Sequence, residues 1–304
     1  MNPGASRERR APHPATTPDM KLFATVTLAL ALPFAASCGS AQGSEMIQNK
    51  GSDTLVNVAQ AWAEAYRTVD PTVVVAVQGG GSGTGISAMI NGTVDIANAS
   101  RQMKDSELED ARANGVDPIE WIVGYDALAI YVHADNPMES ITIEQLADIY
   151  GENGTITHWS QLEVTIPGLE DDEIVRFSRQ NNSGTYAYFR DRVLGKGGNY
   201  KLGSKDLHGS KDVVDACEKT PGAIGYSGLA YATDHVKMVP VIIEGGAPVM
   251  PSVATAVDGT YPIARPLLMY TAGQPVGKIK EYMDWILSEP AQKTIAEKGY
   301  APVK

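Results

Sequence analysis

Three short segments of this 304-residue chain combine glycine with small hydroxyl residues, each just before a stretch with helical spacing. Glycine allows another group to approach the backbone closely, and serine or threonine is typical of a helix N-cap. The unpaired N–H groups at a helix N-terminus, with their partial positive charge, bind anions. Helix capping alone explains any one of these segments, but three of them, one containing Arg179, indicate a shared oxyanion ligand. The segments are GSDT (51–54), GSGTG (81–85) and SRQNNSGT (178–185).

Sequence patterns for other chemistries are weak or missing. The chain has no G-x-x-x-x-G-K-[ST] phosphate loop, and Ser82 is followed by glycine and threonine, so it does not form the G-x-S-x-G motif of a serine hydrolase. GTGISA (83–88) fits the dinucleotide pattern G-x-G-x-x-A, but no acidic residue closes a strand at the required distance. The five histidines are scattered without the spacing of metal ligands. We therefore expect no enzyme activity, no cofactor and no metal.

The charge of the chain excludes some partners and constrains the site. The formal net charge is -11, whereas a nucleic-acid-binding protein presents a basic face. An acidic protein also repels an anion through its overall field, so an oxyanion site must rely on short-range dipoles, N–H groups and one or two arginines. We therefore expect no nucleic-acid partner, and a site built mainly of neutral donors.

The beginning of the chain is typical of an export leader rather than of a fold. Lys21 precedes an apolar run, residues 22–36, that is too short to cross a bilayer and ends in small residues. We predict a signal peptide over residues 1–37. Residues 1–19 would precede the true start if translation begins at Met20.

A cysteine follows the apolar run at the position where a lipoprotein carries its anchor. The segment AASCG (35–39) resembles a lipoprotein signal, in which the cysteine is acylated and becomes the new N-terminus; the alternative is ordinary cleavage nearby. We predict a lipid anchor on Cys38, followed by a short polar tether over residues 38–45. Because Cys217 would then have no partner, we expect no disulfide.

Beyond residue 46, stretches with helical spacing alternate with β-branched runs. Alternation of this kind predicts an α/β fold with layers of helices on a mostly parallel sheet. Helices are expected over residues 53–68, 85–91, 106–114, 142–150, 185–193, 210–219, 276–287 and 290–298, and strands over 72–77, 94–99, 119–132, 174–178 and 223–226.

Five motifs resemble the phosphate-binding proteins of bacterial phosphate ABC transporters, in the same order and spacing. They are GSDTL, VQGGGSGTGISAMINGTVDIANASR, SRQNNSGTYAYF, GAIGYSGLAY and YPIARPLLMYT, and the resemblance covers residues 46–304. The resemblance implies the periplasmic-binding-protein fold, an α/β fold of two lobes with the ligand in the cleft between them. Lobe one would hold residues 46–128 and 262–304, and lobe two residues 129–261. Two crossover strands, near residues 126–132 and 263–270, would form a hinge.

The resemblance also implies a function and a set of partners. Such a protein captures inorganic phosphate in the periplasm, or at the outer face of the cell membrane, and delivers it to the membrane subunits of an ABC permease. We expect a monomer. Three alternatives remain: a binding protein for sulfate, molybdate or tungstate, a phosphoester hydrolase, and a surface adhesin on the same fold.

The family pattern implies particular ligand residues. In lobe one, Thr54 would offer its hydroxyl, Leu55 its backbone N–H, and Ser82 its hydroxyl. In lobe two, the family's R-x-x-x-S-G-T pattern is matched by Arg179, Ser183, Gly184 and Thr185. We expect the planar fork of Arg179 to contact two oxygens of the anion.

One position departs from the family pattern. Better-known members carry an aspartate where this chain has Arg101, and arginine has no acceptor atom for the proton of phosphate. We expect Arg101 to face the cleft and Asp53 to be the substitute acceptor. Two alternatives for Asp53 are a role at the helix N-terminus only, and an ion pair with Arg101.

Overall fold

The computed structural model describes residues 45–243 and 245–303. The predicted signal peptide and the anchor on Cys38 lie outside the described residues, as does nearly all of the tether. Within the described part of the chain, no helix combines the length and the apolar character needed to cross a membrane.

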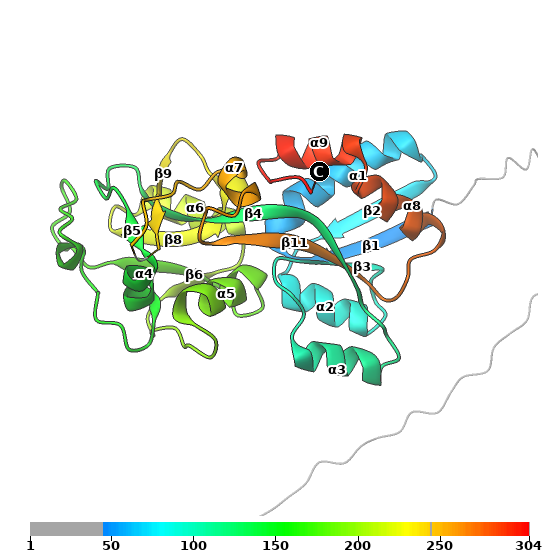
Figure 1. Cartoon of the computed structure of the whole chain (residues 1–304), viewed down its shortest axis with the longest axis horizontal. Coiled ribbons are helices and arrows are strands. Elements are labelled where there is room, and N and C mark those ends of the chain that lie inside the picture. The colour runs from blue at the N-terminus through cyan, green and yellow to red at the C-terminus, as the bar shows by residue number, and fades with distance from the viewer. Residues whose placement is uncertain (1–44, 244, 304) are drawn as a thin grey trace, which may run out of the picture. The chain divides into compact units, whose positions relative to one another are not determined.

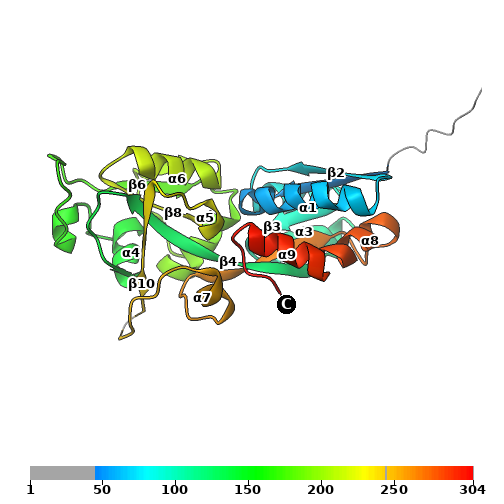
Figure 2. The same cartoon turned by 90° about the horizontal axis from the view of Figure 1, so that it is seen from above.

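Lobe one is a sheet with helices on both faces (Figures 1 and 2). Strand β1 lies between β2 and β3 and pairs in parallel with both. Helices α1, α8 and α9 pack on one face of this sheet, and α2 and α3 on the other. The elements are β1 (Glu45–Gly51), β2 (Val73–Gln78), β3 (Ile96–Ala99), α1 (Val56–Val69), α2 (Ser82–Ile90), α3 (Asp105–Ala113), α8 (Gly277–Ile286) and α9 (Glu289–Glu297).

Lobe two repeats this layered arrangement. Alternate residues of strand β4 (Ile119–His133) face opposite sides of the sheet. Ala129 and Tyr131 pack with α6, whereas Ile130 and Val132 pack with α4 and α5. The elements are β5 (Ile141–Thr142), β6 (Val175–Arg179), β7 (Lys205–Leu207), β8 (Ala223–Gly228), β9 (Val236–Val239), β10 (Val241–Ile242), α4 (Ile143–Tyr150), α5 (Gly184–Phe189), α6 (Ser210–Lys219) and α7 (Val253–Val257).

Two strands run through both lobes, as Figure 1 shows. They are β4 (Ile119–His133) and β11 (Ala264–Thr271), which pair antiparallel with each other. Up to Ala127, β4 pairs with β11, and from Leu128 onward it pairs with β8. The two-lobed α/β fold with two crossover strands is therefore confirmed. The change of partner falls close to residue 128, where the lobe boundary was placed; the boundaries themselves stay a prediction.

The expected elements agree well with the structure, with two corrections, but β1, the strand between β2 and β3, was not predicted. The sheet is mixed rather than mostly parallel, because every pairing between β4 and β11 or between these strands and β3, β8 or β9 is antiparallel. Helix α2 begins at Ser82 rather than at residue 85, because Gly81, with a φ of 89°, turns the chain into the helix. Cys217 is buried as a free thiol, and its burial raises its pKa to about 12.

Candidate functional site

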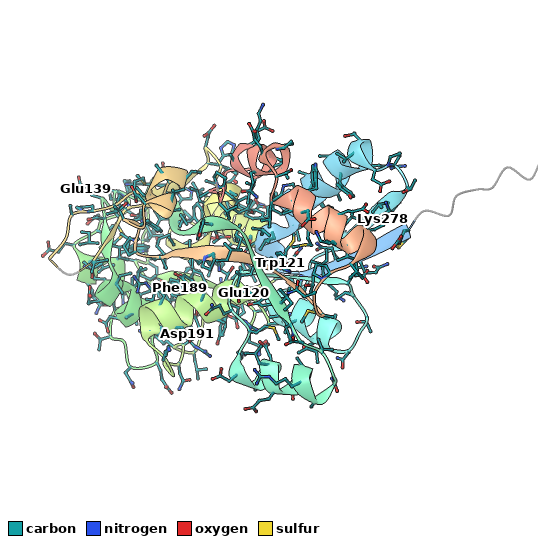
Figure 3. The ribbon with its side chains drawn as sticks, turned by 45° about the vertical axis from the view of Figure 1, so that its right-hand side comes forward. Glu120, Trp121, Glu139, Phe189, Asp191 and Lys278 are labelled. Atoms are coloured by element: carbon teal, nitrogen blue, oxygen red, sulfur yellow. The ribbon has the colours of Figure 1, made fainter. Side chains whose placement is uncertain are left out.

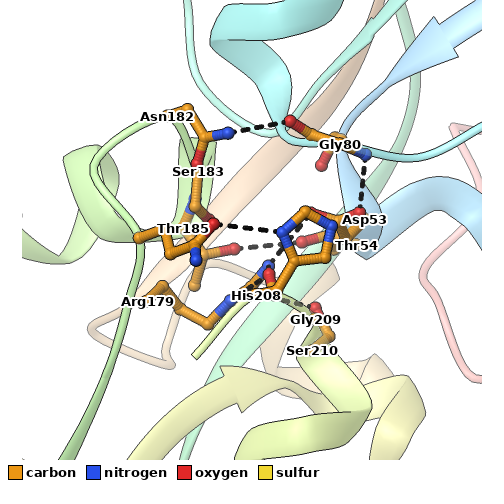
Figure 4. A network of polar contacts seen from close by, with 12 residues as sticks. Asp53, Thr54, Gly80, Arg179, Asn182, Ser183, Thr185, His208, Gly209 and Ser210 are labelled. Atoms are coloured by element: carbon orange, nitrogen blue, oxygen red, sulfur yellow. Dashed lines mark hydrogen bonds and ion pairs between the residues drawn. The ribbon is translucent and has the colours of Figure 1, made fainter. Parts of the chain in front are cut away.

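The three glycine and hydroxyl segments meet where the two lobes touch. Figure 4 shows residues of the first and third segments facing each other. Thr54 lies in a short 3-10 turn between β1 and α1, and Ser82 is the first residue of α2. Ser183 is the N-cap of α5, where its hydroxyl accepts hydrogen bonds from the N–H groups of Thr185 and Tyr186. The first two segments come from lobe one and the third from lobe two.

Thr54 and Thr185 are in direct contact across the lobe junction. Their hydroxyl oxygens lie 3.0 Å apart, and both residues are buried. Because each hydroxyl hydrogen can rotate, two hydroxyls this close can both donate to one oxygen of a tetrahedral anion. The structure thus brings together the hydroxyl donors that the sequence placed in different lobes.

Gly184 explains why the lobes can approach so closely. A Cβ atom on Gly184 would lie 2.2 Å from Ser82 Oγ and 2.6 Å from Ser100 Oγ. Any side chain here would therefore collide with lobe one. Ser100 was not singled out from the sequence. Its N–H donates to Ser82 Oγ at 3.1 Å, and its hydroxyl accepts from Ser52, which adds two buried hydroxyl groups to the site.

Asp53 joins three parts of the site. Its Oδ1 accepts from the N–H of Gly80 at 2.9 Å, and its Oδ2 forms an ion pair with Arg179 Nη2 at 3.2 Å. Its carbonyl oxygen accepts from the Tyr231 hydroxyl at 2.6 Å. The alternative pairing of Asp53 with Arg101 is therefore wrong, because the carboxylate reaches across to lobe two instead.

Arg179 is buried, and most of its donors are already engaged. Nη2 donates to Asp53 and to the carbonyl of His208, Nε also points to that carbonyl, and Nη1 donates to Ser210 Oγ. Of the five N–H donors of a guanidinium, one on Nη1 is left over. The expected contact with two anion oxygens does not fit this arrangement. Burial lowers the pKa of Arg179, and the Asp53 carboxylate opposes that change.

Arg101 does not face the donors. Both of its terminal nitrogens donate to the carboxylate of Glu107 at 2.7 Å, and Nη1 also donates to the carbonyl of Gln102. Arg101 does line the space between the lobes, beside Ser100 and Arg265, but its guanidinium is held by Glu107 rather than turned toward the hydroxyl donors. Glu107 lies in the first turn of α3, six residues after Arg101, and its carboxylate binds the guanidinium. Burial alone would raise the pKa of Glu107, but hydrogen bonds from Arg101 and from the Lys104 N–H hold it below its ordinary value.

Leu55 also differs from the expectation. Its N–H donates to the carbonyl of Ser52 at 3.1 Å, and its side chain packs in the core of lobe one. The backbone donor predicted at Leu55 is therefore already used within the turn.

A second buried arginine, missed from the sequence, sits at the centre of the site. Arg265 on β11 faces Asp126 on β4 in the strand register, and their ion pair is 2.8 Å long and fully buried. Arg265 Nη2 also lies 3.3 Å from the Thr54 hydroxyl and 3.0 Å from that of Thr185. Burial raises the pKa of Asp126, and the charge and hydrogen bonds of Arg265 offset part of this rise. A charged residue inside each apolar crossover strand was the signal that could have revealed the pair, since a buried charge needs a partner.

One group of potential metal ligands lies elsewhere in lobe two. The ligand atoms of His158, Asp171 and Asp172 fall within 4.8 Å of one another. Each of the three already bonds a neighbouring loop group: Thr157 Oγ1 for His158, and backbone N–H groups for the two carboxylates. None of them contacts the donors at the lobe junction.

Comparisons with known proteins agree with this geometry. A family model described as the PBP superfamily domain matches residues 36–290. The phosphate-binding protein PstS of Pseudomonas aeruginosa is 34% identical over 269 residues, covering 84% of this chain and 83% of the relative. The chain belongs to the PBP superfamily, in the family of the phosphate-binding proteins. PstS of Bacillus subtilis is 33% identical over 304 residues, covering 93% of this chain and 94% of the relative.

Solved structures of phosphate-binding proteins have the same fold. A structure from Clostridium perfringens with bound phosphate, assigned as a phosphate ABC transporter substrate-binding protein, has a TM-score of 0.74 and 28% identity. It matches 86% of this chain and 100% of that one. An ABC-type phosphate transport receptor from Vibrio cholerae has a TM-score of 0.66 and 28% identity, covering 84% of this chain and 99% of that one. The resemblance expected from the five motifs is confirmed.

The chemistry available to this phosphate-binding family member is binding by hydrogen bonds. The site offers rotatable hydroxyls from both lobes and two buried arginines, each neutralised by one aspartate. The two ion pairs leave the donor set without net charge.

Proposed function

We propose that this chain captures inorganic phosphate between its two lobes and delivers it to an ABC-type permease. The observation that carries the proposal is the meeting of Thr54 and Thr185 over the buried guanidinium of Arg265. Relatives named phosphate-binding protein and a similar structure with bound phosphate support it. Delivery to a permease is supported by the transport role printed for the structural neighbours.

The proposed ligand set combines the hydroxyls of Thr54, Ser82, Ser183 and Thr185 with backbone N–H groups near Gly184. Arg265 holds its guanidinium beside the hydroxyls of Thr54 and Thr185, and Arg179 holds its own against Asp53. A hydroxyl both donates and accepts, so it can bond an ionised phosphate oxygen or a protonated one. Arg101 and Leu55 are left out of this set, because their donors are bound within lobe one.

The balance of charges suits capture followed by release. Asp126 neutralises Arg265, and Asp53 neutralises Arg179, so the anion meets dipoles rather than an excess of positive charge. Strong unscreened attraction inside a buried site would hold a dianion tightly and slow its release. A neutral donor set allows the protein to bind phosphate when the lobes close and release it when they open.

Selectivity against sulfate requires a hydrogen-bond acceptor, because phosphate at pH 7 still carries a proton and sulfate carries none. We propose that Asp53 is this acceptor. Each of its carboxylate oxygens accepts one hydrogen bond from the protein, and a carboxylate oxygen has capacity for a second. A carboxylate that only capped the helix would contact its own lobe, whereas Asp53 pairs with Arg179 of lobe two.

We also propose that the protein acts outside the cytoplasmic membrane as a monomer, with a lipid on Cys38 as its anchor. The apolar segment and the small residues before the cysteine support export and acylation. Acyl chains on this cysteine would hold the protein at the membrane surface, where the permease lies.

Equilibrium dialysis with labelled phosphate tests the proposal. Wild type is expected to retain phosphate against excess sulfate, molybdate and tungstate. Thr185→Val, which removes one hydroxyl donor, is expected to weaken phosphate binding about 10- to 100-fold, as for a hydrogen bond to a charged group. Thr294→Val, the same change at a half-buried position on α9, is the matched control and should bind like wild type.

Two results would overturn the proposal. Preferential binding of sulfate, molybdate or tungstate would make the chain a receptor for that oxyanion. Turnover of a chromogenic phosphoester, lost in Thr185→Val, would indicate a hydrolase instead.

A further inference from the structure

A pocket of about 600 Å³ lies beside the donor site, between the start of α3 and the segment that follows α5. Its lobe-one wall includes Lys104 and Asp105, and its lobe-two wall includes Asp191 and Lys196. Figure 3 shows Asp191 on the side of lobe two that faces α3. The pocket is therefore formed by both lobes together.

The floor of this pocket is part of the donor site. Ser100 and Arg265 both line it, and both are buried. Ser100 bonds the Ser82 hydroxyl through its N–H, and Arg265 lies within hydrogen-bond distance of the Thr54 and Thr185 hydroxyls. An ion in the pocket is therefore one layer of side chains away from the proposed phosphate position.

The charges along the pocket differ from those of the whole chain. Three of its five cations are paired: Arg101 with Glu107, Arg265 with Asp126, and Arg190 with Asp191. Lys104 and Lys196 are exposed, and neither forms an ion pair with any residue that the structure describes. Among the described residues of the lining, the only charged group that remains besides these two lysines is Asp105. The pocket therefore carries a net charge of about +1, whereas the whole chain carries -11.

We infer that this pocket is the entrance of the site and a first capture point for small oxyanions such as phosphate, held by Lys104 and Lys196. The inference rests on the proposed phosphate-binding function. An arriving anion meets the two lysines at the rim and then moves to the hydroxyls beyond Arg265. The lysines act on the approach of the anion and do not contact it in its final position.

An acidic protein needs such an entrance for a physical reason. Its overall negative field slows the approach of an anion, but at 0.1 M salt the field of a charge decays over about 10 Å. Charges at the mouth therefore outweigh more distant ones, and a cleft with walls of low dielectric constant focuses their field. Charges at the rim of a binding site change association rates and their salt dependence much more than dissociation rates.

Rapid-mixing measurements of phosphate association test the inference. The variant Lys104→Gln/Lys196→Gln is compared with Lys280→Gln/Lys293→Gln, which removes the same two charges from exposed positions on α8 and α9. Association is followed by stopped-flow fluorescence at about 20 mM and about 500 mM salt. Dissociation is followed as labelled phosphate is displaced by an excess of unlabelled phosphate.

At low salt the pocket variant is expected to bind phosphate about three- to tenfold more slowly than wild type, because the steering charges are gone. At high salt this difference should shrink below about twofold, since screening removes steering from both proteins. The dissociation rate should stay within about twofold of wild type, and the control variant should match wild type in both rates.

Two outcomes would overturn the inference. Equal loss of association rate in both variants would show a general charge effect, and a change confined to dissociation would place the lysines in the final site. Failure of wild type to bind phosphate at equilibrium would instead refute the proposed function, which the first dialysis measurement detects separately.

Discussion

Arg265 and Asp126 show what a single pair of residues does for this site. They face each other on the two strands that connect the lobes, and Arg265 also reaches the hydroxyls of Thr54 and Thr185. Breaking a buried ion pair by removing one partner usually costs about 3–5 kcal/mol. Asp126 therefore holds Arg265 in place, and Arg265 in turn fixes where the two hydroxyls lie.

Asp53 carries the first prediction at this scale. Asp53→Asn keeps the shape of the side chain but removes the charge opposite Arg179 and weakens its capacity as an acceptor. We expect weaker phosphate binding and at least an approximately tenfold fall in the preference for phosphate over sulfate, because unmatched polar groups in a dry site discriminate strongly. Calorimetric titration with both anions measures the two affinities.

The ratio of the two affinities separates the possible roles of Asp53. An equal loss for both anions would mean that Asp53 only holds the lobes together, which would contradict its role as the acceptor. Asp234→Asn, an exposed aspartate in a turn of lobe two, is the matched control.

Residue types and local spacing could predict part of this site and not the rest. The segments that hold Thr54, Ser82, Ser183 and Thr185 could be picked out because glycine and hydroxyl residues at helix starts leave a local signal, whereas the ligand roles of these residues were implied by the family resemblance and stay a prediction. Arg265 was missed because its role depends on strand pairing with Asp126, 139 residues away in sequence. Ser100 was missed for a similar reason, since its contacts with Ser52 and Ser82 come from three different segments.

At the scale of elements, the start of α3 decides where Arg101 points. The carboxylate of Glu107 accepts from Arg101 and from the Lys104 N–H, and this holds the pKa of Glu107 below its ordinary value of 4.5. A carboxyl whose pKa is lowered by folding stabilises the fold fully above that ordinary value. The stabilisation is lost as the pH falls through the lowered pKa.

Glu107→Gln tests this account of the α3 terminus. We expect a loss of about 1–2 kcal/mol in the free energy of unfolding at pH 7, because a charged hydrogen-bonded pair is removed. The difference in the free energy of unfolding between Glu107→Gln and wild type should narrow as the pH falls below about 4.5, because wild type then loses the stabilisation from the Glu107 carboxylate. Urea unfolding between pH 3.5 and 7 measures this difference, with the exposed Glu109→Gln on the same helix as control. A difference that stays constant with pH would contradict the stabilising role of the ionised Glu107 carboxylate.

Most helices followed from alternating periodicities, but strands β1, β7 and β9, helix α7 and the direction of the crossover strands did not. Helices α4 and α6 lie close to their predicted positions, because Thr142 caps α4 with Gln145 and the apolar residues of α6 recur on one face. The antiparallel pairing of β4 with β11 joins segments about 140 residues apart and leaves no local pattern.

At the scale of the whole molecule, several polar contacts join lobe one to lobe two. The N–H of Gly83 donates to the carbonyl of Asn182 at 3.0 Å, and Asn182 Nδ2 donates to the carbonyl of Gly80. The Thr54–Thr185 and Asp53–Arg179 contacts lie beside them. These contacts describe a closed form, in which a ligand would be held from both sides.

Gly184→Ala tests whether binding requires this closure. The added methyl group would collide with Ser82 and Ser100 only when the lobes meet, whereas alanine is a better helix former than glycine. We expect phosphate affinity to fall by at least about 100-fold, with a free energy of unfolding of the ligand-free protein within about 1 kcal/mol of wild type. Calorimetry and urea unfolding measure the two quantities. Affinity close to that of wild type would mean that closure to this distance is not needed.

The central claim is that a tetrahedral oxyanion binds between the lobes, against Thr54, Ser82 and Thr185. Arsenate has the same shape and protonation as phosphate, and its anomalous X-ray scattering locates it without reference to a model of the ligand. We predict one strong anomalous peak in crystals grown with arsenate, within hydrogen-bond distance of the Thr54 and Thr185 hydroxyls. Absence of a peak between the lobes, or a peak elsewhere in either lobe, would contradict the account.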